Sequence, residues 1–187
     1  GNLVKTVPPA GVNLLDHAQV LQVAASRAAG YTTAVPAAHI KTTAYRYNTL
    51  NESIWQQTPD AGESNFFYDG LGRVAASQNA KQHQTGNFYS YTRYDLLGRP
   101  VESAEVKPAI VINSQLTRDF STWTSFINAQ NDRTQINFTR YDDTYSAAIS
   151  QKFGTAGQQN LRKRVASVCV FDNKPHLDNQ QYSQATH

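Results

Sequence analysis

The sequence predicts a mainly β protein made of consecutive antiparallel hairpins, and three observations support this fold class. The pattern Tyr-Asp-x-Leu-Gly-Arg occurs at Tyr68–Arg73 and again at Tyr94–Arg99, 26 residues further on. A unit repeated at such a distance is typical of stacked repeat architectures. The aromatic residues are mainly ten tyrosines and eight phenylalanines, which favour strands. Between the two copies, Tyr89 and Tyr91 alternate with polar residues, as in a strand with two different faces.

Each copy of the pattern predicts a tight hairpin turn. The tyrosine ends the incoming strand, and the aspartate accepts hydrogen bonds from backbone amides two residues on. The glycine supplies the positive φ of a short hairpin loop. The arginine begins the outgoing strand, where it can lie against the tyrosine ring or pair with the aspartate. These residues are expected to hold turns rather than to catalyse a reaction. They are Tyr68, Asp69, Leu71, Gly72 and Arg73 in one copy and Tyr94, Asp95, Leu97, Gly98 and Arg99 in the other.

Two further copies are degenerate. In the first, Tyr47 and Asn48 replace the Tyr-Asp pair, and Asn51 replaces the glycine, which asparagine can do because it enters the left-handed region readily. In the last, Tyr141 and Asp142 follow Phe138-Thr139-Arg140, but no Leu-Gly-Arg comes after them. A longer loop through Gly154 and Gly157 is therefore expected to lead to a strand over 162–171.

Two segments change from strand to helix periodicity and are expected to be short helical insertions. In residues 16–30, Asp16 is a good N-cap and Gly30 a good stop. The apolar residues Val20, Leu21, Val23, Ala24 and Ala28 can share one face, which is expected to pack on the sheet. Residues 116–130 carry an aromatic and apolar stripe at helical spacing, expected to cover the sheet or a cavity. That stripe consists of Phe120, Trp123, Phe126 and Ile127.

The whole chain, residues 1–187, is expected to be one segment of such repeats. Residues 1–9 are expected to close a preceding hairpin, because Gly1-Asn2-Leu3-Val4 aligns with Gly72-Arg73-Val74-Ala75. Core repeats are expected over 40–105 and further repeat strands over 131–171, followed by a polar tail over 172–187 without a clear period.

The repeated pattern resembles the tyrosine-aspartate repeat of the Rhs/YD-repeat family, which includes bacterial Rhs and insecticidal toxin-complex shells and the animal teneurins. The residues around it, such as Thr42–Asn48 and Gln159–Val168, are most similar to the large secreted YD-repeat proteins of Bacteroidetes. The resemblance implies hairpins joined edge to edge in a spiralling sheet that closes into a hollow shell around a C-terminal toxin or effector. It also implies a secreted or cell-surface protein whose export signal lies outside this segment.

Composition favours neither a nucleic-acid nor a membrane partner. The net charge is only +3, and the basic residues form no long patch. The dense cluster Arg162-Lys163-Arg164 is interpreted as a solvated or cavity-facing strand, with phosphate binding as the alternative. No apolar run is long enough to span a bilayer. Cys169 is the single cysteine and is expected to pack as a small apolar residue.

The sequence favours no enzyme, and no metal or cofactor site is predicted. The histidines have no metal-ligand spacing; they are His17, His39, His83, His176 and His187. The best pair of carboxylates, Asp142-Asp143, falls in a repeat turn, and a hydrolase that uses it with a histidine is the least favoured alternative. The expected partners are the remainder of the same polypeptide or neighbouring repeats, an encapsulated toxin, and a secretion channel or chaperone. The alternative to a shell segment is an adhesion module that binds carbohydrate or protein.

Overall fold

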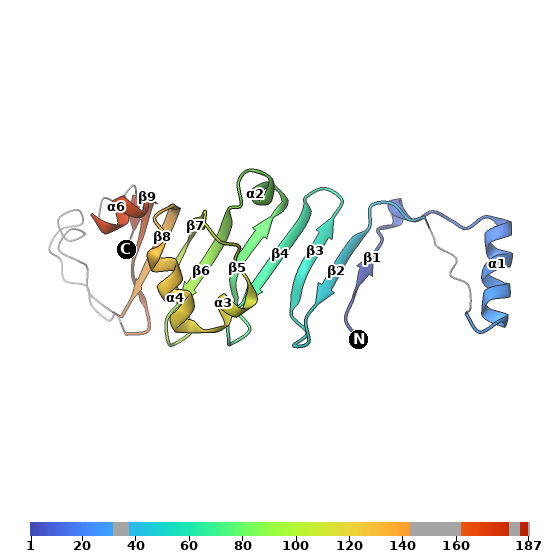
Figure 1. Cartoon of the computed structure of the whole chain (residues 1–187), viewed down its shortest axis with the longest axis horizontal. Helices are drawn as coiled ribbons and strands as arrows, with labels where there is room; N and C mark the ends of the chain where they lie inside the picture. The colour runs from blue at the N-terminus through green and yellow to red at the C-terminus, as the bar shows by residue number, and fades with distance from the viewer. Residues whose placement is uncertain (32–37, 143–161, 180–183, 187) are drawn as a thin grey trace. The chain divides into compact units, whose positions relative to one another are not determined.

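The computed structural model describes residues 1–31, 38–142, 162–179 and 184–186, and it is mainly antiparallel β with a few short helices (Figure 1). The chain forms two compact units, residues 1–63 and 64–187. Within each unit the hairpins follow chain order, so each strand pairs with the strand before it, the strand after it, or both. The prediction of a mainly antiparallel β fold is therefore confirmed.

The first unit contains a small antiparallel sheet and one longer helix. Strand β1 (Lys5–Thr6) pairs with β2 (Thr43–Tyr47), which pairs with β3 (Ser53–Thr58). Between β1 and β2 lie the 3₁₀ turn η1 (Pro9–Gly11) and α1 (His17–Ala28). Pro8 and Pro9 end the short first strand because neither can donate to a ladder.

Helix α1 begins where the sequence predicts, but its apolar face is not buried. Asp16 accepts a hydrogen bond from the Gln19 amide, and the Gln19 side chain reaches back to the Asp16 amide, forming a capping box. However, Val20 is 49% and Leu21 57% exposed. The expectation that this face packs on the sheet is therefore wrong, and the cap rather than burial defines the helix.

The second unit is an antiparallel meander. Its strands pair strictly with their chain neighbours. They are β4 (Gly62–Tyr68, whose first two residues belong to the other unit), β5 (Val74–Asn79), β6 (Tyr89–Tyr94), β7 (Pro100–Val106), β8 (Arg133–Tyr141), β9 (Val165–Asn173) and β10 (Gln184–Thr186). Helix α2 (Ala80–Gln84) connects β5 to β6, and α6 (Lys174–Asp178) follows β9.

Two helices cover one face of this meander. Helices α3 (Ser114–Arg118) and α4 (Phe120–Ala129) lie across the strands β5 to β7 (Figure 1). Trp123 and Ile127 of α4 enter the core with the strand residues Tyr89, Tyr91 and Val106. The expectation that residues 116–130 cover the sheet is met, because burying Trp123, Ile127 and part of Phe126 against the tyrosine-rich strands removes apolar surface from water. Phe120, also expected in this stripe, is 48% exposed.

The structure corrects four details of the predicted elements. Residues 116–130 do not form one helix, because Asp119 has an extended backbone and serves as both the C-cap of α3 and the N-cap of α4. Helix α2 lies within the core repeats predicted over 40–105, and the tail contains α6 and β10; each of the two helices begins after an asparagine N-cap. Strand β9 begins at Val165, so the basic cluster at 162–164 lies in a turn rather than in the strand. Cys169, as predicted, is buried in β9, with 2% of its surface exposed.

Candidate functional site: the hairpin turns and the cavity beside them

The two full copies of the repeated pattern form turns with the same hydrogen bonds. In the first, Asp69 Oδ1 accepts from the amides of Leu71 and Arg73, each at 2.9 Å. The Asp69 amide donates to the Arg73 carbonyl at 2.8 Å. Gly72 has φ 76°, which closes the loop. Asp95, Leu97, Gly98 and Arg99 repeat this arrangement: Asp95 Oδ1 accepts from the amides of Leu97 and Arg99 at 2.9 Å, and Gly98 has φ 82°.

The first degenerate copy builds the same turn from amides. Asn48 Oδ1 accepts from the amides of Leu50 and Glu52 at 2.9 and 3.0 Å. Asn51 occupies the glycine position with φ 62°. Tyr47 ends β2 as Tyr68 ends β4. The side-chain amide of Asn48 donates a hydrogen bond to the Glu52 carboxylate, at the place where the full copies pair aspartate with arginine.

The last copy closes its turn with residues that come much later in the sequence than its aspartate. The Asp142 amide donates to the Arg164 carbonyl at 3.2 Å, and the Lys163 amide donates to Asp142 Oδ1. Lys163 has φ 60°, and Tyr141 pairs with Val165 as Tyr68 pairs with Val74. Lys163 and Arg164 therefore occupy the places of glycine and arginine. Asp143 and the predicted loop glycines lie outside the described residues.

The turn arginines link each turn to the next one along the meander. Arg73 pairs with its own Asp69 at 2.6 Å, but its guanidinium stacks on Tyr94 of the next repeat, 4.1 Å from the ring centroid. Tyr94 in turn donates its hydroxyl proton to the Val74 carbonyl at 3.0 Å. The sequence suggested that the arginine would contact either the tyrosine or the aspartate of its own turn. In the structure it contacts both kinds of residue, but the tyrosine belongs to the next repeat.

The same link recurs one repeat later. Arg99 pairs with Asp95 at 2.7 Å and lies 4.3 Å from the ring centroid of Tyr141. The Tyr141 hydroxyl donates to the Pro100 carbonyl at 3.0 Å. Arg99 Nη1 also contacts Asp142 Oδ2 at 2.6 Å, and its hydrogen bond and the Lys163 amide lower the pKa of Asp142.

A charged network is buried beneath the turns. Glu102 of β7 is 2% exposed and accepts from Arg133 Nη1 at 2.7 Å and from Arg93 Nη1 at 3.0 Å. The Tyr91 hydroxyl donates to the same carboxylate. Burial and the adjacent Glu102 carboxylate raise the pKa of Tyr91 well above its ordinary value, so this phenol remains a proton donor. The network joins β6, β7 and β8 because a buried carboxylate needs charged partners.

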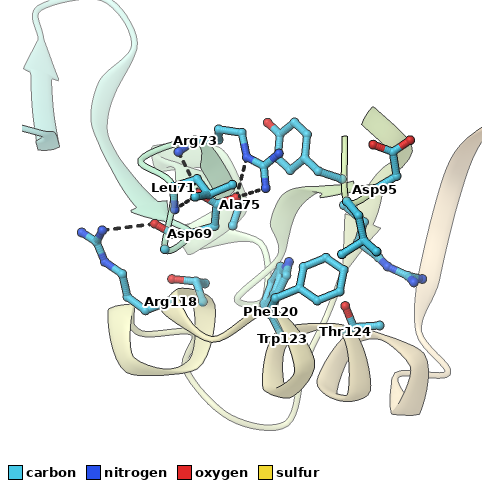
Figure 2. Close-up of a pocket in the computed structure, with 14 residues that line it drawn as sticks. Asp69, Leu71, Arg73, Ala75, Asp95, Arg118, Phe120, Trp123 and Thr124 are labelled. Carbon is cyan, nitrogen blue, oxygen red and sulfur yellow. Dashed lines mark hydrogen bonds and ion pairs between the residues drawn. The ribbon is translucent and has the colours of Figure 1, made fainter. Parts of the chain in front are cut away.

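A cavity of about 360 Å³ lies between the two full turns and the helices α3 and α4 (Figure 2). Leu71, Leu96, Phe120 and Trp123 give it mainly apolar walls. Arg73, Arg93 and Arg118 also line it, as do Asp69 and Asp95. Sequence reasoning placed Phe120 and Trp123 in a helix that covers the sheet, but it did not identify this cavity, because residues from β5, β6, α3, α4 and the two turns meet there only in the folded chain.

The first turn is fastened to α3. The Thr117 hydroxyl donates to the Tyr68 carbonyl at 2.8 Å. Arg118 Nη1 donates to the Asp69 carbonyl at 3.1 Å (Figure 2). A Cβ added at Gly70 would lie 2.8 Å from the Arg118 carbonyl oxygen. The variable position of the repeated pattern is thus glycine here because the helix backbone approaches it, whereas the second turn has Leu96, 90% exposed, at that position.

We expect Gly70→Ala to destabilise the protein by about 1–3 kcal/mol, because α3 must move to admit the methyl group. The matched change Leu96→Ala removes an exposed side chain and should alter stability by less than about 0.5 kcal/mol. Urea unfolding of the two variants measures the difference. Equal stabilities would show that the contact between Gly70 and α3 is not tight.

The N-cap of helix α4 predicts how the stability of the protein depends on pH. Hydrogen bonds from Thr122 and Ser121 lower the pKa of Asp119 to about 2 from an ordinary value of 3.8. Because the folded pKa is the lower one, the cap stabilises the folded state above about pH 4 and is lost as the pH falls towards 2. Between these values the free energy of unfolding should fall more steeply in the native protein than in Asp119→Asn, whose amide caps without titrating. Parallel pH curves would contradict this assignment.

Other sequence candidates do not converge. Within the residues that the structure describes, no three His, Cys, Asp or Glu side chains form a group that could hold a metal ion. His39 Nδ1 accepts from the Asn13 amide at 3.2 Å, and His176 lies 3.5 Å from Asp172. No helix in the described part of the chain is long and apolar enough to cross a bilayer.

No model of a protein family matches the chain, and no curated protein matches it.

Proposed function

We propose that this chain is a structural segment of a large secreted or cell-surface protein of the Rhs/YD-repeat type. In this proposal the hairpins contribute to the wall of a shell that encloses a C-terminal toxin or effector. The chain performs no catalysis, and its main partners are the neighbouring repeats of the same polypeptide.

One observation carries the proposal, namely the recurrence of the link from one turn to the next. Arg73 holds Tyr94, and Arg99 holds Tyr141 in the same geometry, with a tyrosine hydroxyl on the carbonyl that follows each arginine. Residues that recur at the same position in successive turns thus hold the sheet together rather than form a single reaction centre. A hairpin cannot bury both faces alone, and stacking repeats makes a continuous structure.

The intact mass of the natural polypeptide that contains this sequence tests the proposal. An antibody against the segment would isolate that polypeptide from its source, followed by mass spectrometry and electron microscopy. We expect a mass far above 20.8 kDa and hollow particles. A polypeptide near 20.8 kDa, or a large one without an enclosed space, would overturn the shell proposal.

The alternative is a binding module, and the exposed leucines of the turns favour its protein-binding form. Leu71, Leu96 and Leu97 are 77%, 90% and 73% exposed at the turn tips. A carbohydrate-binding form receives less support, because its usual platform is an exposed aromatic surface. The parallel pair Trp123 and Phe126, with ring planes 21° apart, has its tryptophan only 4% exposed.

A further inference from the structure

We propose that the cavity between the two full turns and helices α3 and α4 binds a small carboxylate ligand with an apolar body. This inference rests on the cavity itself and is independent of the shell proposal. The volume of about 360 Å³ lies within the range of small-molecule sites, roughly 300–1,000 Å³.

The walls of the cavity accept an apolar body. Phe120 is 48% exposed at the side of the cavity, and Leu71 and Leu96 extend from the turn tips at its mouth. The turn needs only the backbone of Leu71, whose amide donates to Asp69, so its side chain is available to a ligand. A ligand that covers these three side chains would remove apolar surface from water.

A buried donor at the cavity calls for an acceptor on the ligand. Trp123 is 4% exposed, and its Nε1–H has no hydrogen-bond partner among the residues that the structure describes. Phe120 and Trp123 both line the cavity, and in Figure 2 the ring nitrogen of Trp123 lies at the end of the indole that points away from α4. A buried tryptophan N–H normally finds a partner, and leaving it unpaired is costly. A ligand oxygen at this point would satisfy it.

The charges around the cavity favour an anionic acceptor. The residues that line the cavity include three arginines, Arg73, Arg93 and Arg118, and two aspartates, Asp69 and Asp95. Asp69 pairs with Arg73, whereas Asp95 shares Arg99 with Asp142. The single carboxylate of Glu102 is shared by Arg93 and Arg133, which leaves the Arg93 side of the cavity with an excess of positive charge. A carboxylate therefore complements the site better than a neutral amide.

The test uses Trp123 as its own reporter. Trp55→Phe removes the other tryptophan, and the fluorescence of Trp123 is then followed during titration with 3-phenylpropanoate and, separately, with 3-phenylpropanamide. We expect a saturable change with the acid and binding of the amide that is weaker by roughly fivefold or more. No saturable change with the acid, or equal affinity for the two compounds, would overturn the proposal.

Two neighbouring leucines provide a matched pair of variants. Leu96 lines the cavity and Leu97 does not, yet both are exposed residues of one turn. Leu96→Glu places a negative charge at the mouth and should weaken binding of 3-phenylpropanoate roughly fivefold, whereas Leu97→Glu should change it less than about twofold. Equal effects would mean that the ligand binds elsewhere, which contradicts the proposal.

A titration with a peptide distinguishes the possible sources of the carboxylate. A short peptide that ends in phenylalanine is titrated as the free acid and as the C-terminal amide. Tighter binding of the free-acid peptide than of 3-phenylpropanoate would assign the site to a polypeptide C-terminus, and the reverse order to a small metabolite. Binding of the amidated peptide as tightly as the free acid would overturn the carboxylate assignment.

Discussion

Replacing Glu102 by alanine should destabilise the second unit by about 3–5 kcal/mol, because it leaves a buried charge without a partner. Arg133 is 4% exposed, and its Nη1 donates to Glu102. Tyr91, 2% exposed, would lose the acceptor of its hydroxyl as well. The measurement is urea or thermal unfolding followed by circular dichroism. Since whole domains are stable by only about 5–15 kcal/mol, this variant is expected to be close to unfolding at body temperature.

A variant in which the partners of Glu102 are also replaced separates the effect of an unpaired buried charge from the effect of lost packing. Glu102→Leu combined with Arg133→Met and Tyr91→Phe removes the most deeply buried polar groups together and should recover most of the lost stability, because an apolar replacement of a buried ion pair is often neutral. Arg93 also loses Glu102, but its side chain is 20% exposed and still donates to Asn128. A loss below about 1 kcal/mol for Glu102→Ala, or a triple variant as unstable as the single one, would contradict this account of the network.

Asp69→Ala should cost about 2–4 kcal/mol, since it removes the acceptor of two backbone amides and the partner of a half-buried arginine. The Asp69 side chain is 12% exposed, compared with 22% for Asp95. Asp95→Ala should therefore cost less, while Asp60→Ala, in an exposed turn, should cost less than about 0.5 kcal/mol. Unfolding of the three variants under the same conditions measures the order.

The same substitution should also loosen the following turn. Without Asp69, Arg73 is no longer held against Tyr94, which begins the turn at Asp95. Hydrogen exchange at the amides of Leu97 and Arg99 should therefore become faster in Asp69→Ala, although the substitution lies in another repeat. Faster exchange confined to residues 69–73 would show that the turns are independent.

Local sequence determined the hairpin turns. Aspartate or asparagine, followed by a residue that tolerates positive φ, forms a turn through contacts within four or five residues. For this reason the ends of β4 and β6 at Tyr68 and Tyr94 could be read directly from the sequence. Capping residues were equally readable at Asp16, because a cap also depends only on its own helix.

The failures arose where distant residues complete a local pattern. No glycine and arginine follow Asp142 directly in the sequence. Lys163 and Arg164 take their positions in the turn once β8 and β9 pair. The period of the α1 residues predicted a buried face, but periodicity cannot say whether a sheet lies beneath it, and Val20 and Leu21 are exposed. The stripe predicted in residues 116–130 lies entirely after Asp119, which ends α3 and begins α4 and so divides the predicted helix.

The sequence by itself determined the class of fold and the residues that form the two full turns, because turn and strand preferences act over a few neighbouring residues. Only the tertiary structure decided which tyrosine each arginine meets, which charges surround Glu102, and that a cavity opens beside Trp123. Those contacts join residues from different hairpins and helices. They depend on strand register and helix placement, which follow from packing of the whole unit rather than from any one segment.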